Sequence, residues 1–210
     1  MTDQQVFSPL ILRAAGLSCG RSGLVLTENL DFSLRNGEAL LLVGPNGTGK
    51  TTLLLTLAGV ITPLAGSFAA DGLQGELPLL HYCGHRNAIK PRLSVLENLA
   101  FWAALNGPTG LAPAAALAEV GLDVLAGLDA GYLSAGQSRR LALARLLVSL
   151  RPLWLLDEPT AALDTAGQAL VGRLLDAHLA MGGLAIAATH DPILLDDPDR
   201  LRILQLERAA

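Results

Sequence analysis

The sequence predicts an α/β fold, on two observations. Short apolar runs, which are typical of buried parallel strands, recur along the chain and alternate with leucine-rich patterns that have helical spacing. The clearest of these runs end directly at glycine-rich or polar segments, and parallel sheets bind their ligands at such strand ends. The runs that carry most of the prediction are 39–43 (ALLLV), 153–158 (LWLLDE) and 183–188 (GLAIAA).

The composition allows one substantial domain. The chain has 210 residues, of which 51% are hydrophobic and only 16% are charged. Its most apolar windows are interrupted by charge, at Arg145 and Arg151 and again at Arg173 and Asp176, so we expect no transmembrane helix. The N-terminus lacks a basic-plus-apolar signal segment, which predicts a cytoplasmic chain. The surplus of apolar residues predicts an obligate protein partner.

Charge and cysteine content narrow the classes of partner. The formal net charge of −4 argues against a nucleic-acid-binding surface, so no nucleic-acid partner is expected. Cys19 and Cys83 are isolated and lack the spacing of metal ligands. They are therefore predicted to be reduced thiols in the core or in loops.

A glycine-rich segment follows the first buried run and fits the pattern GxxxxGK[ST]. Its glycines allow the backbone to fold round a polyphosphate with N–H groups pointing inward, at a helix N-terminus whose dipole favours anions. Lys50 is expected to reach the β- and γ-phosphates, and the Thr51 hydroxyl to bind Mg²⁺. The alternative is a glycine turn that matches by chance, but the flanking strand and helix patterns give the required context. The predicted loop consists of Gly44, Pro45, Asn46, Gly47, Thr48, Gly49, Lys50, Thr51 and Thr52.

Residues 10–34, before this loop, contain short apolar runs broken by glycines and predict strands with a hairpin. A nucleotide base needs a surface to lie against. No aromatic residue stands between Leu17 and Leu30, and Arg21 is the nearest planar cation. Its guanidinium either stacks on the base or is simply solvated.

After the loop, residues 59–75 are rich in turn formers, 77–82 predict another buried strand, and 86–92 predict a loop. Two helical stretches follow. Ser94 and Glu97 have the spacing of a capping box for a helix that extends to residue 105.

The second stretch, 114–128, is broken at Gly121. With no strand among them, these helices are expected to form a lobe beside the sheet.

Residues 132–137 read YLSAGQ and precede a helical run at 138–149. The motif alone is no more than a helix cap, but it places small residues, free N–H groups and a hydroxyl at a helix N-terminus. It is therefore a second candidate anion site. Arg139 and Arg140 fall in the first helical turn, where the dipole disfavours cations, so each is expected to have a partner or solvent. The candidate binding residues are Ser134, Ala135, Gly136 and Gln137.

The run 153–158 delivers two carboxylates to its C-terminal end. Asp157 is placed to hold Mg²⁺, and Glu158 to orient or deprotonate the attacking water. A solvated acidic turn is the alternative. The phosphate loop favours the first interpretation because a carboxylate for Mg²⁺ is the part that the loop lacks.

The C-terminal third predicts a turn at 159–164 (PTAALD), a helix at 166–179, the strand 183–188 and an edge strand at 201–206. His190 follows the strand. A single histidine is more often structural, but at a strand end beside a γ-phosphate it is placed to contact that phosphate and sense its loss.

In order, GPNGTGKT, LSAGQ, LWLLDE, AALD and His190 resemble the Walker A, signature, Walker B, D-loop and H-loop motifs of the ATP-binding cassette (ABC) family. The resemblance covers nearly the whole chain. It implies one nucleotide-binding domain, residues 1–210, with a P-loop NTPase core and an antiparallel β subdomain (1–82 and 141–210). A helical subdomain is implied at about 83–140.

The resemblance also implies ATP and Mg²⁺ as cofactors and ATP hydrolysis coupled to transport. In that family each ATP lies in a head-to-tail homodimer, between Gly44–Thr52 of one subunit and Ser134–Gln137 of the other. The ATPase drives integral-membrane permease subunits from the cytoplasmic face of the inner membrane, as a peripheral subunit. The implied roles are catalytic for Glu158, His190 and Lys50, magnesium binding for Thr51 and Asp157, and nucleotide binding for Asp164 and His85.

Two positions depart from the family pattern. Counted back from LSVLENL, His85 stands where the family usually has the Q-loop glutamine, and the adenine-stacking aromatic residue is absent. An imidazole still binds water or Mg²⁺, so the departures concern coupling rather than hydrolysis. Together with GHRNAIKPRLSVLENLAFW, LSAGQSRRLALARL and the short length, they resemble the ATP-binding subunits of haem exporters in cytochrome c maturation. That resemblance implies haem export or delivery.

Other functions are compatible with the same motifs. The chain is alternatively the ATPase of another small ABC exporter, or a soluble cassette ATPase of translation or DNA repair. The soluble proteins usually carry tandem cassettes or long insertions, and this chain has one cassette. A binding-only regulatory cassette is disfavoured by the intact Lys50, Asp157 and Glu158.

Overall fold

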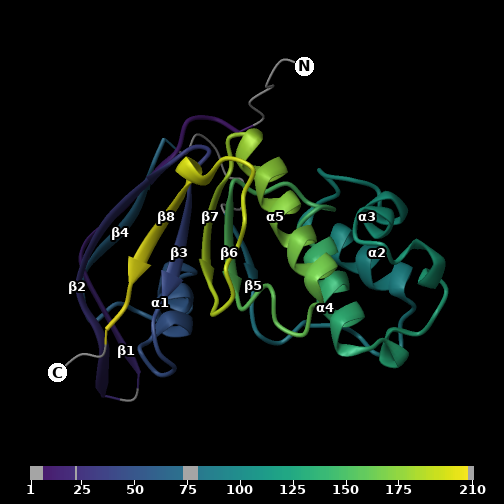
Figure 1. The fold of residues 1–210 in the computed structure, drawn as a ribbon, viewed down its shortest axis with the longest axis horizontal. Coiled ribbons are helices and arrows are strands. Elements are labelled where there is room, and N and C mark those ends of the chain that lie inside the picture. The colour runs from purple at the N-terminus through teal and green to yellow at the C-terminus, as the bar shows by residue number, and fades with distance from the viewer. Residues whose placement is uncertain (1–6, 22, 73–79, 208–210) are drawn as a thin grey trace.

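The computed structural model describes residues 7–21, 23–72 and 80–207 and places two sheets side by side, with a helical lobe beyond the second sheet (Figure 1). One sheet is antiparallel with the order β2-β1-β4, and the other is parallel with the order β5-β6-β7-β3-β8. The predicted α/β class is therefore confirmed. The strands are β1 (Ile11–Arg21), β2 (Leu24–Arg35), β3 (Ala39–Val43), β4 (Ala65–Asp71), β5 (Leu80–Cys83), β6 (Leu153–Asp157), β7 (Leu184–Ala188) and β8 (Leu201–Gln205).

The helices divide between the two faces of the parallel sheet. Helix α1 lies between the two sheets, whereas α5 covers the opposite face and α2 and α3 lie beyond it (Figure 1). The helices are α1 (Lys50–Leu57), α2 (Val95–Asn106), α3 (Pro113–Glu119), α4 (Ala135–Ala144) and α5 (Thr165–Ala180). No helix in the described ranges is both long and apolar enough to cross a membrane.

Both faces of the parallel sheet are buried, which explains the continuous apolar runs in its strands. In β6, Leu153 and Leu155 pack in the core between the sheets, and Trp154 and Leu156 pack in the core on the helical side. Cys19 and Cys83 are free and buried, one in each of these cores. The period of two thus assigns alternate residues of one strand to two different cores.

Two sequence predictions need correction, and a third lies partly outside the described residues. Strand β4 falls in the segment predicted to be rich in turns. It was missed because its sequence AGSFAAD is made of small, mostly exposed residues and lacks an apolar run. The strand predicted at 77–82 is described only from Leu80, since residues 77–79 lie outside the described part. The helix predicted at 138–149 begins at Ala135 and ends at Ala144.

The hydrogen bonds change after the end of α4. Leu146 and Leu147 donate to carbonyls three residues back, which tightens the last turn. The carbonyls of Leu147 and Val148 then accept from Leu111 and Gly110. These two contacts tie the segment after α4 to residues 110–111.

Other predictions are confirmed. Residues 10–34 form an antiparallel hairpin of β1 and β2, β8 is an edge strand, and the capping box of Ser94 and Glu97 begins α2.

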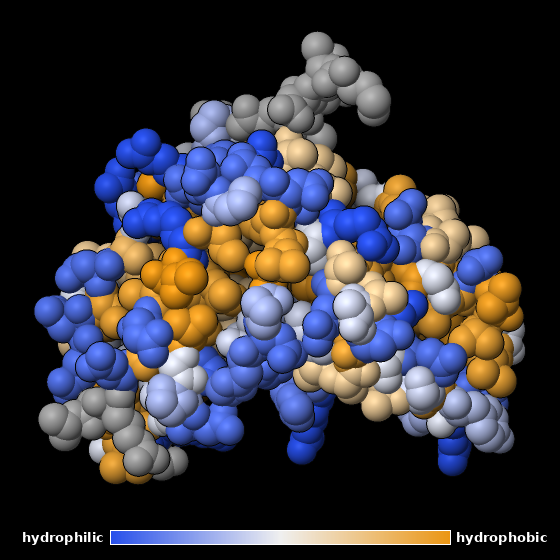
Figure 2. Space-filling view, in the orientation of Figure 1, coloured by the Kyte–Doolittle hydropathy of each residue, from blue (hydrophilic) through white to orange (hydrophobic). Residues whose placement is uncertain are grey.

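Large apolar side chains remain exposed on the described surface, among them Leu105, Val124, Leu194 and Ile203. Figure 2 shows apolar residues gathered near the middle of one face and at the outer edge of the helical lobe.

Candidate active site

The phosphate-loop motif connects the end of β3 to the first turn of α1. Its last residue before the helix, Gly49, has φ 95°, and no side chain caps the helix. A left-handed backbone favours glycine, and a Cβ at this position would come within 2.8 Å of the Leu26 Cβ. The first-turn N–H groups therefore face the loop without a side-chain acceptor, as an anion site requires.

Lys50 reaches back over this loop. Its Nζ donates to the carbonyls of Gly44 (2.7 Å) and Pro45 (3.1 Å) and lies 3.4 Å from His190 Nε2. The same His190 nitrogen is 2.7 Å from Asn46 Oδ1 and 3.4 Å from Glu158 Oε1. The structure thus gathers the loop lysine, the strand-end histidine and the predicted base into one cluster.

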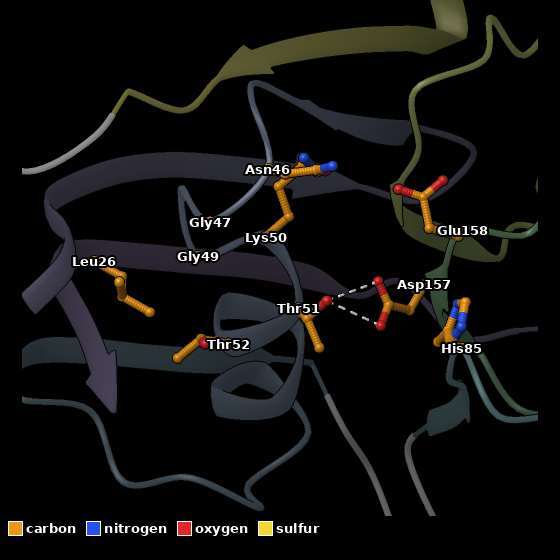
Figure 3. A pocket seen from close by; sticks show the side chains of 10 residues that line it. All are labelled: Leu26, Asn46, Gly47, Gly49, Lys50, Thr51, Thr52, His85, Asp157 and Glu158. Carbon is orange, nitrogen blue, oxygen red and sulfur yellow. Dashed lines mark hydrogen bonds between the residues drawn. The ribbon is translucent and has the colours of Figure 1, made fainter. Parts of the chain in front are cut away.

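Thr51 and Asp157 face each other across the end of the parallel sheet (Figure 3). The Thr51 Oγ1 lies 3.1 and 3.0 Å from the two carboxylate oxygens of Asp157, which is 3% exposed. A hydroxyl beside a buried carboxylate is an oxygen set that fits Mg²⁺. Burial, and then the Asp157 carboxylate, raise the pKa of Tyr82 to about 12, so the neighbouring phenol stays protonated.

Glu158 lies just beyond β6 rather than within it, which corrects the strand predicted to reach this residue. Its φ of 51° is in the left-handed region, and its N–H donates to the Ala188 carbonyl at 2.7 Å. Such a conformation costs about 1–3 kcal/mol in a residue other than glycine and persists only where its surroundings hold it. This turn at the strand end places the Glu158 carboxylate beside His190.

A cavity of about 290 Å³ is bordered by Lys50, Asp157 and Glu158, whereas His190 is not among its lining residues (Figure 3). His85 lies in its wall, on the segment that follows β5, so the Q-loop position does face the phosphate loop. Leu26 is a lining residue that sequence reasoning missed, because nothing in an alternating strand marks one leucine as different. Arg21 is not among the lining residues, which are Leu26, Asn46, Gly47, Gly49, Lys50, Thr51, Thr52, His85, Asp157 and Glu158. Pro45 and Thr48 line a neighbouring depression with Leu206.

The signature segment lines a second cavity, of about 370 Å³. There Arg140 donates to Asp164 at 3.1 Å, and Asp164 also caps α5 by accepting from the Gly167 N–H at 2.8 Å. That backbone hydrogen bond is the main cause of the lowered pKa of Asp164. Ser134, Gly136 and Gln137 line the same cavity, and Ala135 is the first residue of α4.

The two predicted anion sites are therefore separate cavities within one chain. The first holds the phosphate loop and the carboxylates of β6, and the second holds the signature residues and Asp164. Within one chain, the phosphate loop and His85 line the same cavity, whereas the signature segment lines a different one.

Comparison with known proteins places the chain among relatives of similar length. Residues 27–161 match the family described as ABC transporter. A cytochrome c biogenesis ATP-binding export protein CcmA of Rhodopseudomonas palustris (strain HaA2) is 54% identical over 187 residues, covering 87% of this chain and 92% of the relative. The protein of that name from Agrobacterium fabrum is 46% identical over 201 residues, covering 91% and 94%.

A solved structure has the same fold. A Pyrococcus furiosus protein described as an ABC transporter ATP-binding protein superposes with a TM-score of 0.78 at 26% identity, covering 93% of this chain and 97% of that one. Its fold and the family match both agree with the motif order along this sequence. The chain therefore belongs to the ABC transporter family of ATP-binding proteins.

Proposed function

We propose that this chain is the ATP-hydrolysing subunit of an exporter that serves cytochrome c biogenesis and that it powers haem export. As an ABC ATPase it binds ATP and couples hydrolysis to transport by membrane subunits. The observation that carries the ATPase assignment is the cluster of Lys50, His190 and Glu158 at the uncapped start of α1. The export role is supported by the identity with CcmA proteins over about nine-tenths of the chain.

In this proposal the polyphosphate lies on the N–H groups of Gly44–Thr52, with Lys50 on the β- and γ-phosphates. Thr51 and Asp157 would hold Mg²⁺, which when bound would neutralise charge on the phosphate oxygens. Glu158 accepts a proton from the attacking water, and His190 contacts the γ-phosphate.

His85 takes the place of the Q-loop glutamine. It senses the bound nucleotide because it lines the same cavity as the phosphate loop. Leu26 supplies an aliphatic surface near the loop, where the family usually has an aromatic residue.

The second cavity supports a head-to-tail homodimer. Ser134–Gln137 and Asp164 line a cavity that the chain's own phosphate loop does not reach, and a second copy brings that loop to it. The permease subunits dock on this dimer at the cytoplasmic face of the membrane. The exposed apolar side chains support such a partner.

The export role is tested by complementation in a bacterium that lacks its own cytochrome c biogenesis ATP-binding export protein. We expect this chain to restore haem-containing cytochrome c and the Glu158→Gln variant to fail at equal expression. If the parent restores none while the purified chain hydrolyses ATP, the export role is wrong and the ATPase assignment stands. If Glu158→Gln hydrolyses ATP as fast as the parent, Glu158 is not the base.

A further inference from the structure

Arg139, the fifth residue of α4, is a buried arginine whose hydrogen bonds in the described structure go to carbonyl oxygens rather than to a carboxylate. Its side chain is 2% exposed. An arginine has five N–H donors, one on Nε and two on each Nη. Here Nε donates to Pro159 O (3.2 Å), Nη1 to Gly84 O (2.9 Å) and Asn87 Oδ1 (3.0 Å), and Nη2 to Asp157 O (2.7 Å) and Glu158 O (2.8 Å). Every donor is satisfied.

The acceptors fall into two short segments. One consists of the consecutive carbonyls of residues 157–159, at the end of β6, and the other is the segment 84–87, which contains His85. Strands β5 and β6 pair up to Cys83 and Leu156. The guanidinium bridges the two segments just beyond this last pair. Hydrogen bonds from the Arg139 guanidinium therefore connect the two segments where the backbone hydrogen bonds between β5 and β6 end.

The hydrogen bond from Arg139 to the Glu158 carbonyl helps to hold the backbone of Glu158. The left-handed backbone of this residue is held on its N–H side by Ala188 and on its carbonyl side by Arg139 Nη2. Burying a guanidinium is costly, and an apolar side chain would fill the space without that cost. The five directed bonds fix the positions of acceptors in a way that packing alone does not.

We propose that Arg139 is a positioning residue for ATP hydrolysis. It fixes the separation between His85 and the carboxylates of Asp157 and Glu158, and it holds Glu158 in the conformation that presents its carboxylate to His190. This inference rests on the proposed role of Glu158 as the base.

The test compares Arg139→Lys and Arg139→Gln with a matched buried arginine. Arg151, which is 4% exposed, donates to the Leu150 and Asn106 carbonyls and precedes β6, at the opposite end of that strand. For both Arg139 variants we expect kcat to fall by about 10²-fold, with KM for ATP within about threefold, because misplacement of a reacting group by about 1 Å costs this much. Arg151→Gln is expected to lower Tm and to leave kcat unchanged.

A second readout does not depend on turnover. Hydrogen exchange of the nucleotide-free chain is expected to become faster in peptides covering 84–87 and 157–159 in Arg139→Gln, and not in Glu158→Gln. Asn87→Ala, which removes one acceptor of the five, is the milder variant if the Arg139 variants fold poorly. It is expected to lower kcat by a smaller factor.

The proposal is overturned if Arg139→Lys or Asn87→Ala keeps the parental kcat while losing only thermal stability, as Arg151→Gln does. If the parent itself shows no hydrolysis, the proposed function fails instead. In that case unchanged exchange in both segments of the Arg139 variants would still refute the positioning role.

Discussion

The N-termini of α1 and α4 are both candidate phosphate sites, but only α4 has a side-chain cap. Helix α1 begins at Gly49 with no side-chain cap. Helix α4 begins with a complete capping box, in which Gln137 N–H donates to Ser134 Oγ (3.2 Å) and Ser134 N–H donates to Gln137 Oε1 (2.9 Å). The first terminus offers its donors to a ligand, whereas the second already uses two of them internally.

This difference separates a preformed half-site from one that must exchange its own cap for a ligand. Loss of such a cap typically costs about 1 kcal/mol, so binding at α4 has to offset that amount. A phosphate already held by α1 of a second copy supplies both the charge and the placement for that exchange. A single chain is therefore expected to bind ATP through α1 and to hydrolyse it poorly.

The largest effect is expected from Lys50→Ala. Removing the cation of the preformed half-site should lower kcat about 10³-fold, comparable to the loss of one preorganised transition-state donor, and should also weaken ATP binding. Lys90→Ala is the matched control, since the Lys90 Nζ lies over the Phe101 ring at 4.3 Å and Lys90 lines neither cavity. Steady-state turnover and ATP titration measure both quantities. Equal losses in the two variants would contradict the special role of α1.

Gln137→Glu separates capping from phosphate binding in α4. A glutamate accepts the Ser134 N–H as the glutamine does, so the helix should stay capped and Tm should hold. Its negative charge would oppose a γ-phosphate, and we expect kcat to fall about 10–100-fold while ATP affinity of the single chain is retained. The measurements are turnover, Tm and ATP titration. A loss of ATP affinity as large as in Lys50→Ala would show that the two termini are not separate half-sites.

Mixing these two variants tests whether the half-sites meet between copies. In a head-to-tail dimer of Lys50→Ala with Gln137→Glu, one composite site carries both changes and the other carries neither. The mixture is therefore expected to hydrolyse ATP faster than either variant alone at the same total concentration. Turnover that equals the sum of the separate variants at every mixing ratio would argue against the shared site.

The sequence predicted those parts of the site that depend on neighbouring residues. The capping box at Ser94 and the glycine loop before α1 are local patterns, and the structure has both where they were expected. At Ser134 the sequence indicated a helix cap, and the structure shows a full capping box with Gln137. The left-handed turn at Glu158 was not predicted, because it depends on partners at Ala188 and Arg139.

Long-range contacts account for the other differences as well. The partners of Arg139 lie up to 55 residues away along the chain, so the first-turn position predicted for it indicated only a need for some acceptor or solvent. In the structure α4 begins at Ala135, which places Arg139 past the first turn. The segment after α4 is held by residues 110–111, and β4 is a strand because it pairs with β1. No local pattern contains these contacts.

The smallest expected effect comes from α2, which has the same capping box with a glutamate in place of glutamine. Hydrogen bonds from Ser94 lower the pKa of the Glu97 carboxyl, so its stabilisation is present above its ordinary pKa of 4.5 and is lost as pH falls through the lowered value. The Tm difference between the parent and Glu97→Gln should therefore shrink on acidification from pH 7 to below pH 4. Burial lowers the pKa of both His81 and His178 to about 4, which destabilises the fold as pH falls from 6.5, but this contribution is shared by both proteins and cancels. A Tm difference that does not depend on pH would mean that Glu97 caps α2 no better as a carboxylate than as a neutral acid. Charge at a helix N-terminus would then contribute little in this protein, and the comparison of α1 with α4 depends on that charge.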